Sequence, residues 1–404
     1  MKLFTKTATA VVALTALVYS CSKDSSFWSS FIPETDEQPT TAGIQNFVFR
    51  PAVVPATPQN ISQLKVPAGF KVNKFADKLG MPRILAVSST GNVYTSDREK
   101  GLVMMLKDLN KDGISDVTDT VARIEHAHGL AIYNSKMYIA AIREVYVADI
   151  NANGSLGQPR MILQNLPDAG QHPNRTIDFG PDGKMYLSIG STCNACAEPN
   201  PYNATLTQAN PDGTNLKIYA KGLRNMIGFD WHPTTGEIWG MDHGIDWLGD
   251  NDQKEEFNLI RQNAFYGWPY IYGEGKYNPQ PRPPADSTYK QFLDMSTLPT
   301  LTYDAHAAPM QMAFYEGSQF PADFKNDAFV AFHGSWNRSV PVGYKILRVH
   351  FENGKPVRMD DFLTGFLVDN NHSVFGRPVG LAVHTDGSLL VSDDTNGVIY
   401  RISH

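Results

Sequence analysis

One type of segment recurs six times along this chain: an apolar strand, a tight polar turn and a second apolar strand. Its copies span 84–97, 129–141, 177–190, 227–242, 312–334 and 379–394. Each copy alternates apolar and polar residues with a period of two around a turn containing Gly, Asp or Asn, which is typical of a β-hairpin. Most copies start about 45 to 50 residues apart, the repeat length of propeller blades. The repeats therefore predict an all-β fold, a six-bladed β-propeller, with loop insertions after the fourth and fifth copies.

The two ends of this repeat region are expected to pair with each other. The last copy continues into the strand-like segment GVIYRIS at 397–403, and FKVNKFA at 70–76 is an early strand that would close the ring. No G-x-G-x-x-G motif follows a strand to open a helix, which argues against a nicotinamide-binding fold. A pair of β-sandwiches is the alternative architecture, and the regular spacing of the hairpins favours the propeller.

The N-terminal residues have the features of an export signal. Lys2 and Lys6 precede a short apolar run that ends before Cys21, so residues 1–20 are expected to be a signal peptide. Cys21 resembles the lipidated cysteine of a bacterial lipobox, and the alternative is an ordinary signal peptide with a chance cysteine. The segment 21–58 is rich in Ser, Thr and Pro and is expected to be a tether, which leaves 59–404 as the propeller domain.

Charge and hydropathy limit the partners of such a chain. The formal net charge is −6 and basic residues do not cluster, which argues against nucleic acid and against a basic membrane-binding surface. No apolar run reaches the roughly 20 residues of a membrane span. We therefore expect an exported protein that contacts the bacterial outer membrane only through a lipid anchor.

Two oxygen-rich segments are candidates for calcium binding. The first, DLNKDGISDVTD at 108–119, has oxygen-bearing side chains at positions 1, 3, 5, 9 and 12 of an EF-hand-type loop and Gly at position 6. The sequence predicts a structural calcium site there, formed by Asp108, Asn110, Asp112, Asp116 and Asp119. The second segment, 241–260, carries six acidic residues and is interpreted either as a calcium loop or as a solvated acidic loop.

Polar and charged residues also gather at the edges of the hairpins. His172 and Arg175 precede the third copy. They are interpreted either as a general base beside a cation or as a capped turn with a surface arginine. Arg224 and Asn225 precede the fourth copy, and "FHGSWNR" follows the strand of the fifth. Because these residues occupy corresponding points of successive repeats, we expect them to face one mouth of the central channel.

The longest of these motifs resemble a known family. HPNRTIDFGPDGKMYLSIGSTCNAC at 172–196, KGLRNMIGFDWHPTTGEIWGMDHGIDWLGD at 221–250, YGWP at 266–269 and GRPVGLAV at 376–383 are similar to the soluble quinoprotein sugar dehydrogenases, in particular their sorbosone/pyranose dehydrogenase branch. The resemblance covers about residues 60 to 403. It implies a six-bladed propeller that binds pyrroloquinoline quinone (PQQ) and Ca²⁺ over its channel and oxidises a sugar hydroxyl or an aldehyde hydrate.

The resemblance also implies roles for individual residues. His172 matches the catalytic base, and Arg224 and Asn225 match the pair that contacts the quinone oxygens. The carbonyls of Gly244 and Ile245 match the segment that holds the cofactor's calcium, although Ile245 stands where the family often has Pro. The remaining expected cofactor contacts are Arg377, Arg338, Asp394 and His128, the last in a region where the glucose-oxidising branch has Gln and where His126 also stands.

The pair Cys193 and Cys196 is the remaining motif, CNAC. Because Ala197 follows it, the motif lacks the His of a haem attachment site, and no second thiol pair completes a zinc site. A disulfide is expected for an exported chain, and we expect it to support the His172 loop.

Three functions are compatible with these features. The first is a PQQ- and Ca²⁺-dependent sugar dehydrogenase with an external electron acceptor, a quinone or a cytochrome, since the chain has no C-x-x-C-H motif. The alternatives are a calcium-dependent lactonase-type hydrolase on the same architecture, and a non-catalytic surface propeller that binds glycans or proteins.

Overall fold

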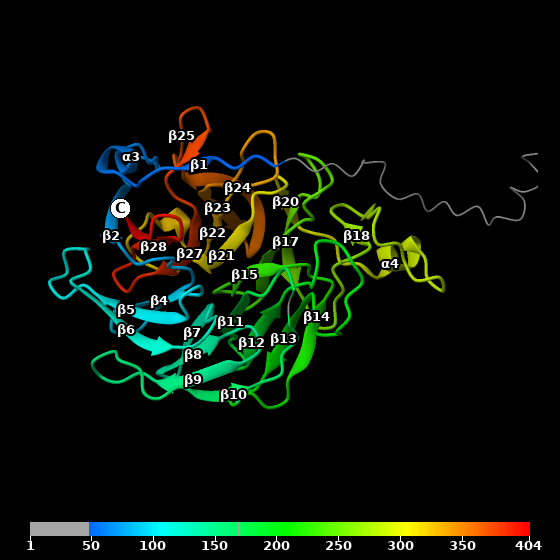
Figure 1. Ribbon diagram of the computed structural model, residues 1–404, viewed down its shortest axis with the longest axis horizontal. Helices are drawn as coiled ribbons and strands as arrows, with labels where there is room; N and C mark the ends of the chain where they lie inside the picture. Colours follow the sequence, from blue (N-terminus) through cyan, green and yellow to red (C-terminus); the bar gives the residue numbers. More distant parts are fainter. Residues whose placement is uncertain (1–47, 169) are drawn as a thin grey trace, which may run out of the picture. The chain divides into compact units, whose positions relative to one another are not determined.

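The computed structural model describes residues 48–168 and 170–404 (Figure 1). All described residues belong to one compact unit of the chain. The predicted signal peptide and Cys21 lie outside the described residues. Within the described ranges, no helix is long and apolar enough to cross a membrane.

Four-stranded antiparallel sheets make up most of the described chain (Figure 1). The first three are β3–β4–β5–β6 (Leu85–Val87, Val93–Asp97, Leu102–Lys107, Val117–Arg123), β7–β8–β9–β10 (Gly129–Tyr133, Lys136–Ala140, Val145–Asp149, Arg160–Leu163) and β11–β12–β13–β14 (Arg175–Phe179, Met185–Ile189, Thr205–Ala209, Lys217–Lys221). The others are β15–β16–β17–β20 (Met226–Trp231, Ile238–Asp242, Glu255–Ile260, Leu301–Tyr303), β21–β22–β23–β24 (Pro309–Phe314, Ala328–Phe332, Lys345–Glu352, Lys355–Leu363) and β27–β28–β29–β2 (Pro378–Val383, Leu389–Asp393, Val398–Ser403, Lys71–Ala76).

The first two strands of each sheet coincide with the six hairpins predicted from the sequence. The first strands contact one another in the order β3, β7, β11, β15, β21 and β27, and β27 contacts β3 again. The early strand β2 pairs antiparallel with the C-terminal β29, with Val72 opposite Ile402, which confirms the predicted closure. The described chain is thus nearly all-β and has the arrangement of a β-propeller.

The burial of successive strands within each sheet shows how the sheets pack. The second strands β4, β12, β16, β22 and β28 are buried along their whole length, so both of their faces contact neighbouring sheets. The outermost strands β6 and β24 are mostly exposed. Apolar clusters accordingly form between consecutive sheets, such as Met137 and Ile139 of β8 with Tyr94 of β4. The core is therefore divided among the sheet interfaces.

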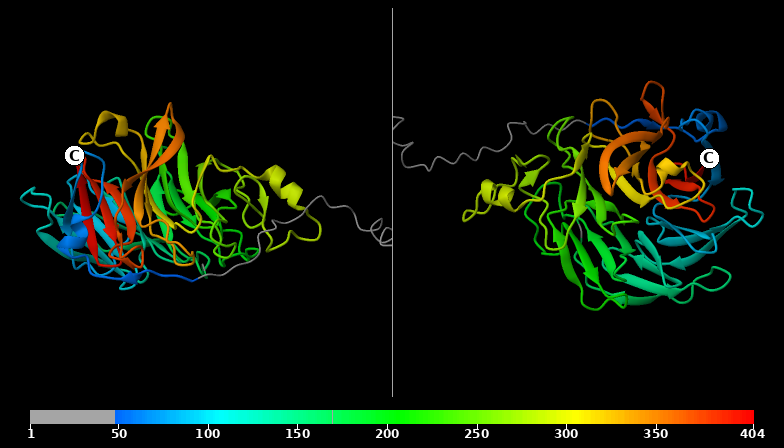
Figure 2. Two further views of the ribbon diagram at one scale, coloured as in Figure 1. Left: turned by 90° about the horizontal axis from the view of Figure 1, so that it is seen from above. Right: turned by 180° about the vertical axis from the view of Figure 1, so that it is seen from behind.

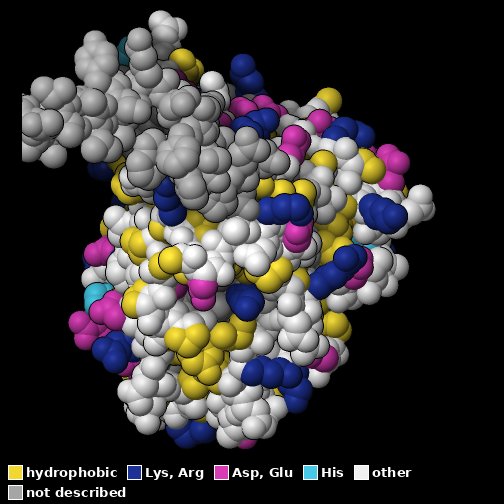
Figure 3. Space-filling model, turned by 90° about the vertical axis from the view of Figure 1, so that its right-hand side faces the viewer, with side chains coloured by type: hydrophobic (Ala, Val, Ile, Leu, Met, Phe, Trp, Pro, Cys, Tyr) yellow, Lys and Arg dark blue, Asp and Glu magenta, His cyan; other side chains and the backbone are white. Residues whose placement is uncertain are grey.

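Insertions occur in the two long gaps between hairpins, as predicted. Between β17 and β20, a projection contains β18 (Ile271–Tyr272), β19 (Lys276–Tyr277) and helix α4 (Tyr289–Met295), and it extends away from the sheets in three views (Figures 1 and 2). A capping box between Thr288 and Gln291 begins α4. The projection packs its own apolar cluster of Tyr270, Ile271 and Tyr289. On the face that carries it, acidic and basic side chains are interspersed (Figure 3).

The second long gap holds β25 (Leu367–Val368) and β26 (Ser373–Val374). Here the segment 48–58, assigned to the tether by its composition, contacts the sheets. Its strand β1 (Ala52–Val53) pairs parallel with β26, and Phe49 forms a bridge with Asn337. The short helices α3 (Pro58–Ser62) and η1 (Ala322–Phe324) are the other helical elements of the described ranges.

Candidate functional site

The loops at one end of the sheets carry most of the candidate residues. Because paired strands are antiparallel, the first strand of each sheet begins at the end where the second strand finishes. We call this end the site face. Residues just before a first strand are Arg83, His128, His172, Arg224, His306 and Arg377, and residues just after a second strand are Ser191, His243, His333 and Asp394. These candidate residues therefore lie at one end of the sheets, and their convergence on one mouth of the channel stays a prediction.

His172 lies in the loop before β11, beside the end of β12. Its Nδ1 is 2.9 Å from both the carbonyl oxygen and the Oγ of Ser191. A carbonyl oxygen can only accept, so Nδ1 carries the proton and Nε2 has a free lone pair. Burial and, to a smaller extent, the nearby charge of Arg224 lower the pKa of His172 to about 3. The imidazole is therefore neutral at physiological pH and suited to accept a proton.

Gly190 permits this arrangement. A Cβ at this position would lie 2.7 Å from the Cβ of His172 and 2.8 Å from the Oδ1 of Asn225. Any larger residue would therefore separate the imidazole from the amide. The close approach of these two candidate residues depends on the missing side chain.

Arg224 is buried, with 3% of its surface exposed, and its guanidinium is fixed on several sides. Its Nε donates to the carbonyl of Asn194 (3.0 Å), and its Nη2 donates to the Oδ1 of the same residue (2.6 Å). Nη2 also lies 3.4 Å from the Oδ2 of Asp246. The guanidinium carbon is 5.6 Å from the ring centre of Trp268, within the range of a cation–π contact.

Asp246 joins several elements of the site face. Its carboxylate is close to Arg224 and to Nδ1 of His306 (3.9 Å), and its carbonyl accepts from Nδ2 of Asn337 (2.6 Å). Burial alone would raise the pKa of Asp246, but His306 and Arg224 hold it below its ordinary value. A permanent negative charge thus lies beside the two candidate catalytic groups.

Buried carboxylates hold the backbone of the site. Asp242 accepts hydrogen bonds from the main-chain N–H groups of Arg224 (2.7 Å) and Asn225 (2.6 Å). Glu255 accepts from the N–H of Gly244, and burial raises its pKa to about 7. Burial also raises the pKa of Asp242 to about 6. The interpretation of 241–260 as a solvated acidic loop is therefore wrong for these residues, because β16 and β17 carry them into the interior.

The Gly244–Ile245 segment offers two carbonyl oxygens. Its N–H groups are taken by Glu255 (2.9 Å) and by Oε1 of Gln253 (3.3 Å). Within the described part of the chain, neither carbonyl accepts a hydrogen bond. Two adjacent carbonyl oxygens that are not engaged elsewhere are the kind of ligand that Ca²⁺ prefers.

A second charged group forms on the same face between β28, β22 and β3. Asp394 contacts Nε2 of His333 (2.9 Å) and Nη1 of Arg83 (2.5 Å). Burial would raise the pKa of Asp394, but His333 and Arg83 hold it far below its ordinary range. Arg377 is half-buried nearby and donates to the carbonyls of His333 (3.0 Å) and Gly334 (2.8 Å). The group thus brings the side chains of Arg83 and Arg377 together around the buried Asp394, and the neighbouring Asp393 accepts from the main-chain N–H of Arg377 (2.8 Å).

His128 lies between the two groups, buried before β7. Its Nδ1 is 2.9 Å from the carbonyl of Arg175, while its buried Nε2 has no hydrogen-bond partner in the described chain. Burial lowers its pKa to about 3. His128 thus holds a buried acceptor that has no partner among the described residues.

The other predicted residues lie elsewhere or contact other groups. Arg338 is half-buried after β22, and its Nη1 donates to the carbonyl of Ala305 (3.2 Å). The 108–119 segment connects the end of β5 to β6, at the end of the sheets opposite the site face. There Asp108 accepts from the N–H groups of Asp112 (3.2 Å) and Gly113 (2.8 Å), whereas Asp119 belongs to β6 opposite Met105.

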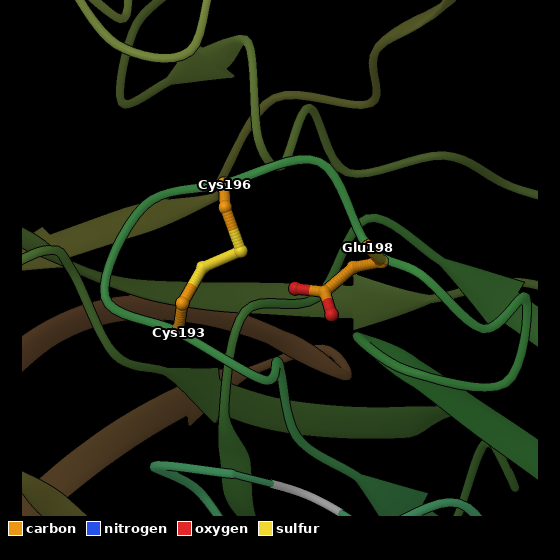
Figure 4. Close-up of side chains that lie close together, drawn as sticks. All are labelled: Cys193, Cys196 and Glu198. Carbon is orange, nitrogen blue, oxygen red and sulfur yellow. A yellow bond between two sulfur atoms is a disulfide. The ribbon is translucent and has the colours of Figure 1, made fainter.

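Cys193 and Cys196 form a disulfide in the loop after β12 (Figure 4). The carboxylate of Glu198 points toward this disulfide and accepts from Trp268 Nε1 (3.1 Å). These three residues are the one group of at least three His, Cys, Asp or Glu in the described ranges whose ligand atoms lie within 4.8 Å of one another. The sulfurs bond to each other, so the group is a structural clip.

Several site residues were not predicted. Asn194 and His243 lie inside motifs quoted above but were given no role, and Arg83 lies outside them. Their roles depend on contacts across separate loops. His243 Nδ1 is 3.5 Å from Nδ2 of Asn225, for example. The one available signal was position, because each lies beside the start of a first strand or just after a second strand.

Comparisons with known proteins agree with this arrangement. A family model described as TrAA12-like matches residues 64–404. An uncharacterised protein of Borreliella burgdorferi is 32% identical over 84% of this chain and 91% of its own length. The PQQ-dependent pyranose dehydrogenase of Coprinopsis cinerea is 25% identical over 86% of this chain, and the match covers 56% of the length of that enzyme. A calcium structure of a Trichoderma reesei carbohydrate-active enzyme of family AA12 shares the fold, with a TM-score of 0.74 and 21% identity over 87% of this chain and 98% of that one.

Proposed function

This chain belongs to the TrAA12-like family, and on that premise we propose that it is a quinoprotein sugar dehydrogenase that uses PQQ and Ca²⁺. Its substrate is a sugar or a sugar-derived aldehyde of the sorbosone, aldose or pyranose type. The observation that carries the proposal is the arrangement of the site face, where a neutral imidazole with a free Nε2 lies beside a buried arginine. Electrons then pass to an external acceptor.

The residues of the site face fit PQQ. This cofactor carries three carboxylates and an ortho-quinone, so it needs cations and hydrogen-bond donors on one surface. Arg224 lies at one side of the face, and Arg377 and Arg83 lie at the other. The unpartnered buried Nε2 of His128 lies on the same face. We therefore assign the quinone oxygens to Arg224 and Asn225, and the carboxylates to Arg377 with Arg338.

The Gly244–Ile245 carbonyls are the proposed ligands of the catalytic Ca²⁺. This assignment is supported because neither carbonyl oxygen accepts a hydrogen bond within the described residues, while buried side chains accept from both N–H groups. Hydrogen bonds to Glu255 and Gln253 therefore fix the backbone of this segment. A cation held there would withdraw electrons from a neighbouring quinone oxygen.

His172 is the proposed general base. Ser191 fixes the Nδ1–H tautomer, so Nε2 takes the hydroxyl proton of the sugar as the C–H bond breaks. When bound, PQQ supplies the hydride acceptor. Arg224 stabilises the negative charge that develops on the neighbouring oxygen, and burial strengthens this interaction. Asp246 stabilises the imidazolium that forms on His172.

We also propose that the sheets form six blades of one propeller. Six four-stranded sheets within the described ranges, the cyclic contacts of their first strands and the pairing of β2 with β29 support this count. Such closure joins the two ends of the domain in one blade and leaves no exposed central edge.

Export and lipidation at Cys21 complete the proposal. The support comes from the sequence of residues 1–21. A Cys21→Ser variant should lose the acyl mass from its N-terminal peptide and move from the membrane fraction to the soluble fraction. Retention of the variant in membranes would contradict the anchor.

Reconstitution tests the function directly. Apoprotein is titrated with PQQ in the presence of Ca²⁺, and turnover is followed with an aldose panel and a dye acceptor. We expect saturable PQQ binding and sugar oxidation, and His172→Asn should abolish turnover while retaining PQQ. The Asn side chain keeps a donor for Ser191 but has no base. Absence of PQQ binding would overturn the proposal, and lactone hydrolysis by PQQ-free protein would favour the lactonase alternative.

A further inference from the structure

The loop closed by the Cys193–Cys196 disulfide contacts Arg224 directly and is linked to His172 through Ser191. Its enclosed residue Asn194 accepts two hydrogen bonds from Arg224, one at the main-chain carbonyl and one at Oδ1. Its first cysteine accepts, at the carbonyl oxygen, a hydrogen bond from Ser191 Oγ (2.9 Å). Ser191 in turn orients His172. One four-residue ring therefore lies between the base and the arginine.

The contacts of Asn194 fix the orientation of the guanidinium. Nε and Nη2 lie on one edge of the guanidinium plane, and both donate to Asn194 at 3.0 and 2.6 Å. Two bonds from one edge to one residue define a plane as well as a distance. Within the described chain, Nη1 donates no hydrogen bond to protein. The opposite edge of the guanidinium thus remains available to a ligand.

The same loop also supports the flat face of Arg224. Glu198 accepts from the N–H (3.0 Å) and Oγ1 (2.9 Å) of Thr192 and from Nε1 of Trp268. Trp268 is the ring that lies against the guanidinium. Figure 4 shows Glu198 directed toward the loop from its C-terminal side. The loop therefore restrains Arg224 at its edge through Asn194 and at its face through Trp268.

The chemistry of position 194 matters for the charge of the site. An amide oxygen accepts hydrogen bonds without neutralising the arginine, whereas a carboxylate would form an ion pair with it. Oδ1 of Asn194 also accepts from the N–H of Asp246 (3.1 Å), so it links Arg224 to the loop that carries Gly244. A neutral acceptor held in a ring therefore orients the buried cation without placing a second carboxylate beside it, in addition to that of Asp246.

We propose that Asn194 is the positioning residue for Arg224, and that the Cys193–Cys196 disulfide acts in catalysis by holding Asn194 in place. The inference rests on the proposed function, because Arg224 matters for turnover only if it faces a cofactor. Asn194 itself does not touch the reacting atoms. Its effect is on the position of the guanidinium and, through it, on the electrostatic environment of His172.

The first test compares Asn194→Ala with wild type and with Asn200→Ala. Asn200 lies in the same loop, and its Oδ1 accepts only from the N–H of Tyr202. We expect Asn194→Ala to lower kcat about 10- to 100-fold at saturating PQQ, with a change in sugar KM of less than about threefold. Asn200→Ala should leave both constants unchanged. An unaltered kcat in Asn194→Ala, alongside active wild type, overturns the inference but not the proposed function.

The second test asks whether the disulfide acts through Asn194. The double variant Cys193→Ser/Cys196→Ser should lower kcat, and combining it with Asn194→Ala should lower kcat no further than Asn194→Ala alone. Independent roles would instead give multiplied losses. Multiplied losses in the triple variant would refute the proposed coupling.

The third test needs no cofactor. The charged groups that face His172 are Arg224, His243 and Asp246, and Arg224 lowers its pKa. If Asn194→Ala lets the guanidinium move away, the titration of the His172 imidazole in apoprotein should shift to higher pH. Proton–carbon NMR spectra, assigned with His172→Asn, measure this shift. An unchanged titration, with native melting, would show that Arg224 keeps its position without Asn194.

Discussion

Asp242 fixes the main chain of Arg224, because its Oδ2 accepts a hydrogen bond from the N–H of that arginine at 2.7 Å. This bond is separate from the side-chain contacts of Arg224 on the site face. The other carboxylate oxygen accepts from Asn225 at 2.6 Å and from His243 at 3.1 Å. A single buried carboxylate therefore fixes the backbone before β15 and after β16. It positions the proposed quinone-contacting pair without contacting a ligand itself.

We expect Asp242→Asn to destabilise the fold by about 2 kcal/mol, because the new amide N–H₂ cannot accept and leaves a buried N–H unpaired. PQQ affinity should fall with it, since Arg224 and Asn225 lose their fixed backbone. Urea unfolding and PQQ titration measure the two effects. Exposed Asp361, which pairs with Lys345, provides the matched control Asp361→Asn. Equal stability of the two variants would contradict this role of Asp242.

The low pKa of His172 has consequences for both activity and stability. Because the folded protein takes up this proton only near pH 3, the base remains neutral from pH 8 to pH 5, and protonation of His172 should not lower kcat/KM in that range. The unfolded chain takes up the proton near pH 6.5. Stability is therefore lost as pH falls below that value, by about 1–2 kcal/mol at pH 5. His172→Asn should remove this part of the slope in denaturation curves. An equal slope would contradict the shift.

Glu256 should act in the opposite direction. It is buried in β17, its Oε1 accepts from Gly273 (2.6 Å), and burial raises its pKa to about 8. Between its unfolded pKa near 4.3 and pH 8 the folded state holds one more proton, so stability falls as pH rises. Glu256→Gln keeps the acceptor and does not titrate. We expect the variant to gain about 3–4 kcal/mol over wild type from pH 5 to pH 8, and a constant difference would contradict this.

Arg377 is expected to contribute to cofactor affinity more than to turnover. Its side chain is held by the carbonyls of His333 and Gly334, which leaves its charge for an anionic ligand. Arg377→Gln should weaken PQQ binding about 10- to 100-fold, in line with loss of a charge-assisted hydrogen bond, with kcat at saturating PQQ retained. Exposed Arg358, paired with Asp360, gives the control Arg358→Gln.

The 108–119 loop should be independent of catalysis because it lies at the opposite end of the sheets. We predict that Asp108→Asn/Asp112→Asn removes a calcium-dependent gain in melting temperature, since Asp108 anchors the turn through Asp112 and Gly113. PQQ affinity should stay at its wild-type value. Thermal melts with and without Ca²⁺ provide the measurement, and a melting temperature that never responds to Ca²⁺ would refute a structural site there.

The hairpins illustrate what local sequence specifies. Period-two alternation and Gly-containing turns are local properties, so each pair such as β11 and β12 could be located from its residues. Their spacing also predicted the pairing of β2 with β29, although these strands lie at opposite ends of the chain. The acidic segment 241–260 shows the limit. Its charges were compatible with a calcium loop or with a solvated loop, but the neighbouring sheets bury Asp242, Glu255 and Glu256.

The sequence by itself determined the repeating hairpins, the closure of the sheets and the residue types available for acid–base and cofactor chemistry, because these depend on local pattern and composition. Only the tertiary structure decided which residues meet. Asn194 and Arg224 are 30 positions apart, and His333 and Asp394 are 61 positions apart. Their contacts arise because antiparallel strands return successive loops to one end of the sheets. Burial at that end then sets the protonation of His172 and the orientation of Arg224.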